Sequence, residues 1–415
     1  MTQTASPRAP RQAGIGFIFA TALVDVIAMG VMIPVLPNLV RSMVGGDTAV
    51  AADYTMIFAV TWGVMQFVCS PILGMLSDRF GRRPVLLISI FGLGIDYIFM
   101  ALAPNLGWLF VGRVINGITS ASFSTANAYI ADITAPENRA KAFGMMGAAF
   151  GLGFILGPAI GGFLGQYNLR WPFYLSAALA LANWLYGYFV LPESLPKERR
   201  TTSLNWSKAN PVGSLNLLTS HPGLVGLAAI WFLFQMSHNV FPSIFVLYVG
   251  HRFGWGPSQA AVMLVITGVL SVIVQAFVVG RVVKLVGERT ALMIGLIALV
   301  SGFVTYGLAA SPGVFYFGQV LQAFGGLIGP SLQSLMSSRV GPSEQGRLQG
   351  VNSAMMGICA IIGPAVYLSL LAFAIRHEAS LGLPGLPILM AAGFSLVALG
   401  LSIRLARAQP VAAVQ

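Results

Sequence analysis

Three ionisable residues lie inside long apolar stretches of the sequence, where charges are rare. Asp25 and Asp96 each lie about twelve residues from the nearer basic end of their stretch, or about 18 Å along a helix. Arg113 lies within a third stretch, in GRVING. A charge at such a depth in a membrane costs several kcal/mol unless it is paired or hydrated. The spacing predicts either that these groups carry protons, because low polarity favours the neutral carboxyl group, or that they form fixed pairs, with Asp25 as a candidate partner of Arg113.

Uncharged polar side chains also recur within the apolar stretches. Gln235, His238 and Asn239 are spaced to share one helix face, and so are Gln319 and Gln322. Such groups would give a small-molecule cavity neutral donors and acceptors, and hydrogen bonds between helices are the alternative for each of them. The full set of candidate cavity residues is Gln66, Asn116, Gln235, His238, Asn239, Gln275, Gln319 and Gln322.

The composition requires a membrane around these residues. Only 8% of the 415 residues are charged and 56% are hydrophobic, and the mean hydropathy is +0.81. A soluble chain of this kind would have too few polar side chains to cover its surface. The composition therefore excludes a soluble enzyme, a disordered chain and a secreted disulfide scaffold. We find no nucleotide-binding glycine loop, hydrolytic triad or metal cluster, so we expect no enzymatic activity and no resident cofactor.

Twelve apolar stretches are long enough to cross a lipid bilayer as helices. They are 14–38, 55–77, 85–103, 106–131, 142–166, 171–191, 222–249, 258–280, 290–310, 312–337, 350–374 and 384–405. If both termini are cytoplasmic, 18 of the 23 Lys and Arg residues fall on the cytoplasmic side and four on the other, with Arg113 inside a span. This bias predicts that both termini are cytoplasmic. It also indicates that the net charge of +11 reflects membrane topology and not nucleic-acid binding.

The two halves of the chain resemble each other at a constant offset of 206 residues. GRVINGI at 112 matches GQVLQAF at 318, GMLSDRFGRR at 74 matches GRVVKLVGER at 280, and Gly157-Pro158 matches Gly363-Pro364. The repeat predicts an all-α membrane protein with two six-helix bundles, at 1–191 and 222–415, joined by a cytoplasmic loop at 192–221. Such repeats occur in alternating-access transporters, whose substrate site lies between the halves.

Two local motifs accompany the repeat. The loop GMLSDRFGRRPVLL, at 74–87, joins the second and third spans, and its candidate functional residues are Gly74, Asp78, Arg79, Gly81, Arg82 and Arg83. The fifth span carries a ridge of small residues that allows close helix contact, together with a proline that weakens one backbone hydrogen bond. These packing residues are Gly153, Gly157, Pro158, Gly161 and Gly162.

With the repeat, these motifs resemble signatures of the major facilitator superfamily, and within it of the tetracycline/proton antiporters. LVDVIAMGVMIPVLP, AYIADIT, LPES and EQGRLQG add to this resemblance, which covers nearly the whole chain. It implies a bacterial inner-membrane exporter that exchanges a drug for protons, with the residues matching Asp25, Gln66, Asp78, Asp96 and Arg113 important for transport. It also implies that the 74–87 loop is a latch between the halves that stabilises the outward-facing state. The substrate of that family is a tetracycline chelated to a divalent cation.

The sequence departs from that family at one position. The antiporters have a further carboxylate in the ninth span, and here the matching residue is Leu299, so the second half has no acid in any predicted span. Another amphipathic drug is therefore an open alternative as substrate. A metabolite facilitator or proton symporter, and a receptor-like membrane protein that does not transport, are further alternatives. The sequence does not indicate an oligomeric state.

Overall fold

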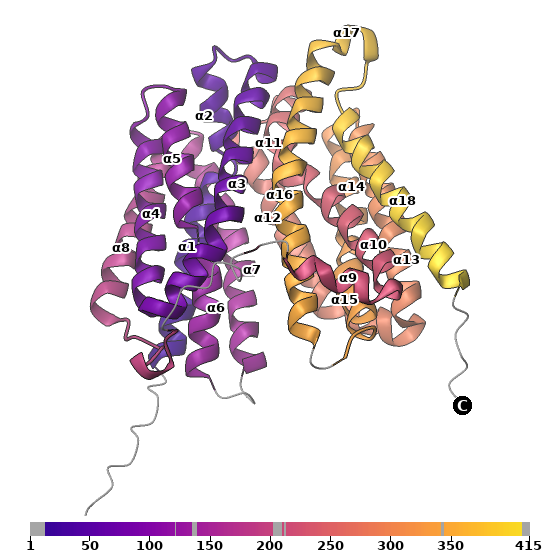
Figure 1. The fold of residues 1–415 in the computed structure, drawn as a ribbon. Helices are drawn as coiled ribbons and strands as arrows, with labels where there is room; N and C mark the ends of the chain where they lie inside the picture. The colour runs from indigo at the N-terminus through magenta and orange to yellow at the C-terminus, as the bar shows by residue number, and fades with distance from the viewer. Residues whose placement is uncertain are drawn as a thin grey trace, which may run out of the picture.

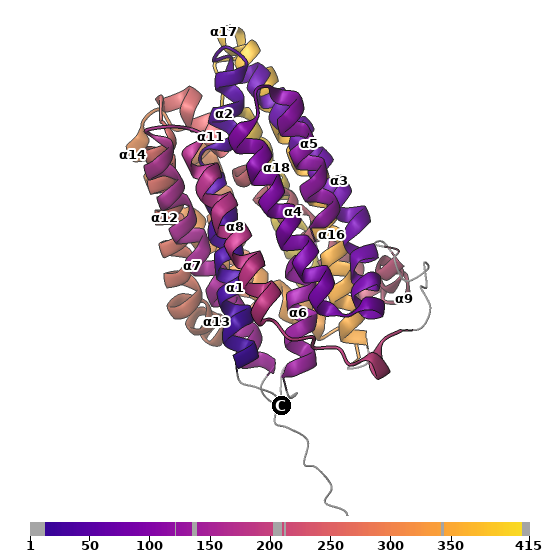
Figure 2. The same cartoon turned by 90° about the vertical axis from the view of Figure 1, so that its left-hand side faces the viewer.

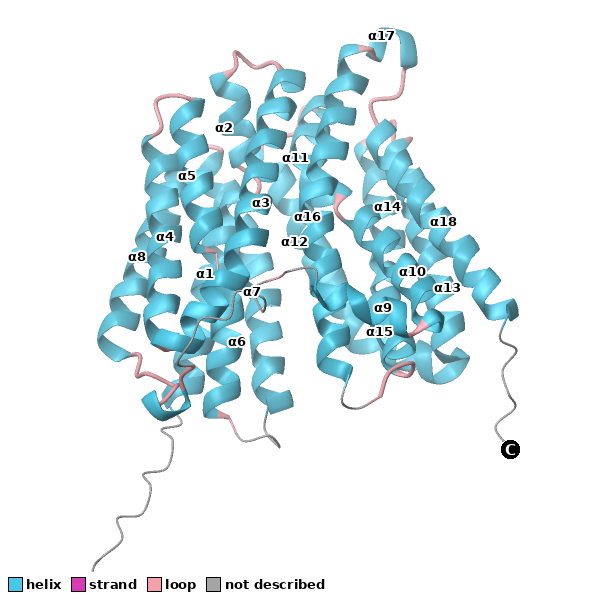
Figure 3. Cartoon of the chain, viewed as in Figure 1, coloured by secondary structure: helices cyan, strands magenta, loops and turns pink. Residues whose placement is uncertain are grey.

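A computed structural model describes residues 13–120, 122–134, 139–201, 210, 213–341 and 344–408, and all regular structure within them is helical (Figure 3). The first half contains α1 (Ala13–Met32), α2 (Leu36–Met43), α3 (Thr48–Phe80), α4 (Arg82–Leu102), α5 (Leu106–Thr119), α6 (Ser122–Ile133), α7 (Arg139–Gly165) and α8 (Trp171–Val190). The second half contains α9 (Leu217–Ser220), α10 (Pro222–His238), α11 (Val240–Phe253), α12 (Pro257–Ile273), α13 (Gly280–Gly307), α14 (Pro312–Ala323), α15 (Ile328–Ser337), α16 (Gln345–Arg376), α17 (Glu378–Leu381) and α18 (Leu386–Ala408).

The helices form two bundles that lie side by side (Figures 1 and 2). In the first bundle, α1 packs against α7 and α8, and α4 packs against α5 and α8. In the second, α18 packs against α10 and α13. Helix α3 meets α16, and α7 meets α12, across the boundary between the bundles. This arrangement agrees with the two-bundle membrane fold that the repeat predicts.

Several predicted spans are broken in the middle, which the hydropathy pattern does not reveal. α1 ends before Pro34 and the chain restarts as α2, while Ser120 interrupts the fourth predicted span between α5 and α6. The tenth is interrupted by a 3-10 turn, Phe324–Leu327. Within the described residues nine helices are long and apolar enough to span a membrane, and one of them, Pro257–Gly307, covers two predicted spans. The prediction of twelve spans is compatible with this pattern.

Large apolar side chains cover much of the outer surface, as a lipid environment requires. Phe189 is 78% exposed and Leu285 is 82% exposed. Trp108, Tyr167 and Trp171 are exposed near helix ends, where aromatic residues commonly meet the membrane interface. The surface therefore fits a chain that crosses the bilayer many times.

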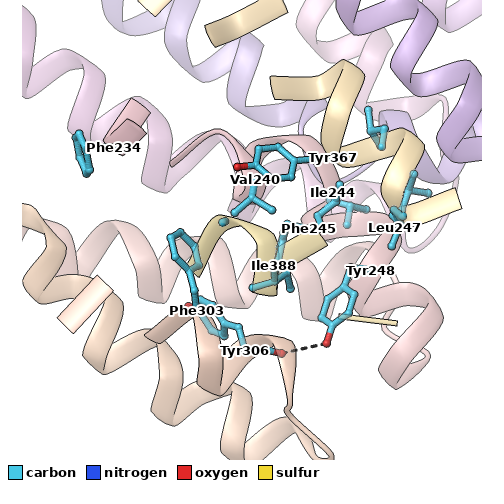
Figure 4. Close-up of a cluster of buried hydrophobic side chains, with 14 of the residues drawn as sticks. Phe234, Val240, Ile244, Phe245, Leu247, Tyr248, Phe303, Tyr306, Tyr367 and Ile388 are labelled. Atoms are coloured by element: carbon cyan, nitrogen blue, oxygen red, sulfur yellow. Dashed lines mark hydrogen bonds between the residues drawn. The ribbon is translucent and has the colours of Figure 1, made fainter. Parts of the chain in front are cut away.

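The interior of the second bundle is aromatic at one end (Figure 4). Tyr248 and Tyr306 are about 1% exposed, and the Tyr248 hydroxyl donates a 3.0 Å hydrogen bond to the Tyr306 carbonyl. Phe315 packs on both rings. These contacts fix α11, α13 and α14 against one another, and the tyrosine hydroxyl satisfies a backbone carbonyl that would otherwise be buried without a donor.

The repeat is visible in the backbone at two glycines that are 206 residues apart. Gly81 has φ 107° and ψ 163°, and Gly287 has φ 77° and ψ 163°. A side chain would be strained at these positive φ values, so glycine permits the sharp turn into the following helix in both halves. The third and ninth predicted spans therefore begin in the same way.

The halves contact each other toward one end of the molecule. We call the end where α1 begins and α18 ends the terminal end, and the opposite end the far end (Figure 1). On the far-end side, Asp53 of α3 forms an ion pair with Arg376 of α16. Closer to the middle, Phe67 of α3 packs against Gly357 of α16. These contacts close the boundary between the halves at the far end.

The same helices lack such contacts near the terminal end. Gly74 of α3, Gly147 and Gly151 of α7, and Gly346 of α16 have no described atom within 4 Å of the place where a Cβ would lie. In Figure 1 the helices of the two bundles diverge toward this end. We call this arrangement, with the halves in contact at the far end and diverging at the terminal end, open at the terminal end.

Candidate functional site

A buried polar site in the first bundle is built around Asp96. This carboxylate, 0% exposed on α4, forms an ion pair with Arg113 of α5. Its Oδ2 also accepts a 2.9 Å hydrogen bond from the Asn116 side chain. Arg113 and Asn116 are i and i+3 on α5, so both side chains reach the same point of α4. A charged pair with an added donor is what a charge inside a membrane protein needs to remain buried.

One oxygen of Asp96 is left without a donor. Among the described residues, Oδ1 of Asp96 has no hydrogen-bond partner. It faces Gly112 of α5, where an added Cβ would lie 2.7 Å away. An acceptor that is buried without a donor is costly, and a proton on this oxygen would remove the charge. Because Gly112 has no side chain, there is space for this oxygen beside α5.

The site extends to the boundary between the halves through Trp62 of α3. The Trp62 indole N–H donates a 2.7 Å hydrogen bond to Oδ1 of Asn116. The next residue, Gly63, packs against Ala360 and Ile361 of α16. Two hydrogen bonds therefore connect Asp96 to a helix that contacts the other half.

Asp25 lies in a separate polar site. It is 3% exposed on α1, and its Oδ1 accepts a 3.0 Å hydrogen bond from the Asn183 amide of α8. The same amide nitrogen also donates to the Thr21 carbonyl at 3.2 Å. The structure thus pairs Arg113 with Asp96, and the expectation of an Asp25–Arg113 pair is wrong. Both carboxylates lie inside the first bundle, and neither lies on the surface between the halves.

The predicted cavity residues do not form one cluster. Asn116 is part of the Asp96 site, and Gln319 is buried in the second bundle, where it accepts a hydrogen bond from Tyr306. Gln66 donates to the Ser120 hydroxyl at 2.8 Å, which links α3 to the break before α6. Gln322 packs against Gly302 of α13. These four act between helices in this conformation.

The remaining polar candidates are more accessible. His238 is exposed, while Gln235 and Asn239 are half-buried, and the Asn239 amide donates to the Gln235 carbonyl at 2.9 Å. Gln275 is exposed on the π-helical segment Val274–Val279 and donates to Ser271 at 3.4 Å. A role of these four in a substrate cavity stays a prediction.

The 74–87 segment, predicted as a loop, forms the end of α3 and the start of α4 with only Gly81 between them, and its charged side chains bind within the first half. Arg82 contacts Asp78 at 2.6 Å and Asp132, at the end of α6, at 3.0 Å. The Arg83 guanidinium donates to the Tyr188 carbonyl at 2.5 Å, and Arg79 lies over the Phe80 ring. No described atom that could touch an added Cβ on Gly74 lies within 4 Å of it, and the role of this segment as a latch between the halves stays a prediction.

A carboxylate outside the predicted site organises this loop. Glu193, in LPES after α8, accepts hydrogen bonds from the backbone N–H groups of Arg82 at 2.8 Å and Arg83 at 3.3 Å. A carboxylate at a helix start satisfies donors that have no partner within the helix and meets the positive end of the helix dipole. An added Cβ on Gly81 would collide with Glu193. The sequence showed the LPES motif, but it gave no sign that Glu193 of this motif contacts Arg82, 111 residues away.

The small residues of α7 allow very close packing. An added Cβ on Gly157 would lie 2.6 Å from Cα of Gly30 on α1, and Gly153 faces Val26 of α1. Gly161 faces the Val31 backbone of α1. On its other face, α7 contacts α12 across the boundary between the halves. There Gly162 packs against Pro257 and Ala261. Pro158 lies inside the helix, beside Gly30.

The described residues contain no cluster of three or more His, Cys, Asp or Glu side chains that could hold a metal ion. Leu299, where a carboxylate was expected from the family resemblance, is 2% exposed and packs against Gly325. Neither Leu299 nor Gly325 could pair with a charge at this position.

Comparison with known proteins places this arrangement in context. The profile of the Major Facilitator Superfamily matches residues 18–364 and 227–413. Tetracycline resistance protein, class C, of Escherichia coli is 39% identical over 349 residues, which cover 84% of this chain and 87% of that protein. Multidrug resistance protein 2 of Bacillus subtilis is 28% identical, covering 84% of this chain and 86% of that protein.

A solved structure shows the same fold at lower identity. The human organic anion transporter MFSD10 (TETRAN) aligns with a TM-score of 0.68 and 23% identity, over 96% of this chain and 100% of that chain. The similarity supports the two-bundle architecture.

Proposed function

Because this chain belongs to the Major Facilitator Superfamily, we propose that it exports amphipathic drugs across the inner membrane of a bacterium in exchange for protons. The observation that supports export is the 39% identity to a tetracycline resistance protein over most of both chains. The buried carboxylates Asp25 and Asp96 support proton coupling. No resident cofactor is part of the proposal, and the transported drug includes any divalent cation that it chelates.

The coupling follows from the two states of Asp96. As a carboxylate it holds Arg113 and Asn116. A proton on Oδ1 would make the acid neutral and weaken both contacts, because hydrogen bonds to charged groups are roughly twice as strong as those between neutral groups. When Asn116 is held less firmly by Asp96, its hydrogen bond with the Trp62 indole would shift, and α3 would be displaced relative to α16. Loading of a proton is thereby connected to the boundary between the halves.

Asp25 is the second proposed proton carrier. Its partner is an amide and not a cation. Protonation would therefore remove a buried charge without leaving an unpaired cation behind. The two acids would serve different tasks, with Asp25 as the simpler proton-binding group and Asp96 as the group whose protonation changes helix contacts.

If both termini lie in the cytoplasm, as the distribution of Lys and Arg predicts, the terminal end faces the cytoplasm. In that state a drug would enter between the halves from the inside. Closure at the terminal end and opening of the Asp53–Arg376 side would release the drug outside. Alternation between two such states is how the fold moves a substrate without a continuous channel.

The test is transport by the purified protein in liposomes with an imposed proton gradient, with tetracycline as the first substrate, in the presence and absence of Mg²⁺. We expect Asp25→Asn to abolish gradient-driven transport, by roughly 100-fold or more, because Asn cannot take up the proton that general acid–base exchange requires. Asp47→Asn is the matched control, since Asp47 caps α3 from an exposed loop and Asn caps equally well. Normal transport by Asp25→Asn would refute the coupling role of Asp25. If the unaltered protein transports at the same rate with and without the proton gradient, antiport is refuted.

A further inference from the structure

Two hydroxyl groups are buried in the first bundle without a hydrogen-bond partner. Tyr97 of α4 is 0% exposed and Thr21 of α1 is 2% exposed. Among the described residues, neither the Tyr97 hydroxyl nor the Thr21 hydroxyl has a partner. A hydroxyl that is buried without a partner destabilises a fold, and such groups are usually satisfied by the protein or by an ordered water molecule.

Both hydroxyls belong to the surroundings of Asp25. Thr21 and Asp25 are i and i+4 on α1, so their side chains lie on one face of the helix, one turn apart. The charge of Asp25 acts on the Tyr97 hydroxyl across the space between α1 and α4. Helices α6 and α8 each pack against both α1 and α4, and they hold these two helices close enough for that interaction.

Helix geometry places Tyr97 and Asp25 at a similar depth. Gly94 of α4 packs against Leu181 of α8, two residues before Asn183. Side chains of a helix point back toward its N-terminus, so the Tyr97 ring extends from its own position toward the level of Gly94. Asn183 binds Asp25 at the same part of α8. The Tyr97 hydroxyl therefore approaches the level at which Asp25 is bound.

Asp25 can accept more hydrogen bonds than it receives from the protein. A carboxylate can accept several, and the Asn183 amide nitrogen divides its two donations between Asp25 and the Thr21 carbonyl. Within the part of the chain that the structure describes, no second donor reaches Asp25. Polar groups that are too far apart for a direct hydrogen bond are commonly connected by water. A buried water needs about two to four polar partners, and the carboxylate and the two hydroxyls supply them.

We propose that the Tyr97 and Thr21 hydroxyls hold a water molecule against the carboxylate of Asp25. The inference deepens the proposed function and rests on it, because this water would deliver the proton that Asp25 carries during antiport. A proton arriving from outside binds the water, and the water then transfers one proton to the carboxylate. One O–H bond breaks as the new one forms, and the water is left neutral. Tyr97 and Thr21 are positioning residues that keep their own protons.

Other titratable groups on the neighbouring helices are bound elsewhere or exposed. Asp96 of α4 pairs with Arg113 on the α5 side. Asp132 and Tyr129 of α6 bind partners at its terminal end, and α7 presents glycines to α1. The tyrosines of α8 are exposed and are Tyr174, Tyr186 and Tyr188. The titration of Asp25 therefore reports on Asn183 and the proposed water.

The experiment follows the carboxyl C=O band of Asp25 by infrared spectroscopy while the pH is varied, in the full-length protein in liposomes without drug or gradient. Asp25→Asn identifies the band by removing it. In Tyr97→Phe we expect the band to persist to a pH about one unit higher, because a hydrogen bond favours the charged carboxylate and this variant loses the water that donates it. The matched control, Tyr248→Phe, removes a buried tyrosine hydroxyl from the second bundle and should leave the titration of the band unchanged.

A second variant removes the other hydroxyl. Thr21→Val keeps the branched shape of the side chain and should shift the band in the same direction as Tyr97→Phe. The two changes combined should shift it by about as much as the larger single shift, because both hydroxyls hold the same water. Thr21→Val decides the matter if Tyr97→Phe does not fold. A shift in the combined variant equal to the sum of the single shifts would overturn the shared water.

A hydroxyl that lacked any partner would respond differently to its removal. Tyr97→Phe would then raise the unfolding temperature, since a buried polar group is lost, and would leave the titration of the band unchanged. That result, or an equal shift in Tyr248→Phe, would overturn the proposal. The infrared titration needs neither drug nor transport, so it tests the water site even if transport in liposomes refutes antiport.

Discussion

Arg113 and Asp96 form a pair whose members depend on each other for burial. Arg113 is 6% exposed and Asp96 is 0% exposed. The sequence predicts that an acid or a carbonyl must neutralise Arg113, but it cannot identify which acid. Asp25 and Asp96 are at similar depths along their helices, and the choice depends on how α1, α4 and α5 rotate against one another.

We predict that Arg113→Gln alone destabilises the protein by roughly 3–5 kcal/mol, since it leaves a buried carboxylate without its cation. Arg113→Gln combined with Asp96→Asn should recover most of this loss, because no net charge then remains. Denaturant unfolding in detergent measures both. Neither variant should transport against a gradient. Equal stability of the single and double variants would contradict a direct dependence between the two residues.

Trp62 carries the connection from the Asp96 site to α3. Trp62→Phe keeps an aromatic ring but removes the N–H that Asn116 accepts, a loss of about 1 kcal/mol. If this bond transmits the coupling, gradient-driven transport falls by about fivefold, as that free energy implies. Initial rates in liposomes measure the effect.

The control for this variant is Trp231→Phe in α10. Trp231 is half-buried, and its indole N–H has no hydrogen-bond partner among the described residues. Losing it should leave transport near the unaltered rate. A similar fall in both variants would assign the effect to ring size and not to the hydrogen bond.

At the scale of elements, the pairing of α1 with α7 depends on the absence of side chains. The glycine spacing on the fifth predicted span indicates a flat face, and the structure identifies α1 as the helix that uses most of it. The breaks at Ser120 and Phe324 were not predicted, because the flanking residues are as apolar as an unbroken span. At Ser120, the hydroxyl accepts a hydrogen bond from Gln66 of α3, 54 residues away in the chain.

Two glycines of α7 provide a matched test of this packing. Gly157→Ala should destabilise the protein by roughly 1–3 kcal/mol, since its Cβ would press on the α1 backbone. Gly151→Ala faces open space in this conformation and should be neutral or stabilising by up to about 1 kcal/mol, through higher helix propensity. Thermal unfolding in detergent compares them. If the two variants are equally stable, close α1–α7 contact does not hold the first bundle together.

At the scale of the whole molecule, the Asp53–Arg376 pair joins the two halves at the far end. The side chains are 36% and 49% exposed, so the pair contributes no more than about 1 kcal/mol. That is still enough to change the ratio of two conformations by about fivefold.

We predict that Asp53→Asn shifts the protein away from the state that is open at the terminal end, and that the exchange Asp53→Arg with Arg376→Asp restores it. The readout is the rate at which a membrane-impermeant thiol reagent labels Gly147→Cys, in a background where Cys69 and Cys359 are replaced by serine. Labelling from the terminal side should slow in Asp53→Asn by up to about fivefold, the limit set by that change in ratio. Failure of the exchanged pair to restore labelling would show that the ion pair is not what holds this end closed.

The sequence alone determined the membrane environment, the repeat and the buried position of the two acids, because composition and periodicity are properties of the chain itself. Its glycines also permit the close approach of α7 to α1 and the sharp turns at Gly81 and Gly287. Tertiary structure decided the partners: Asn183 for Asp25, 158 residues away, Trp62 for Asn116, 54 residues away, and Glu193 for the 74–87 loop. It also decided which end is open, since a repeat with two equal halves permits both states and only the contacts between them select one.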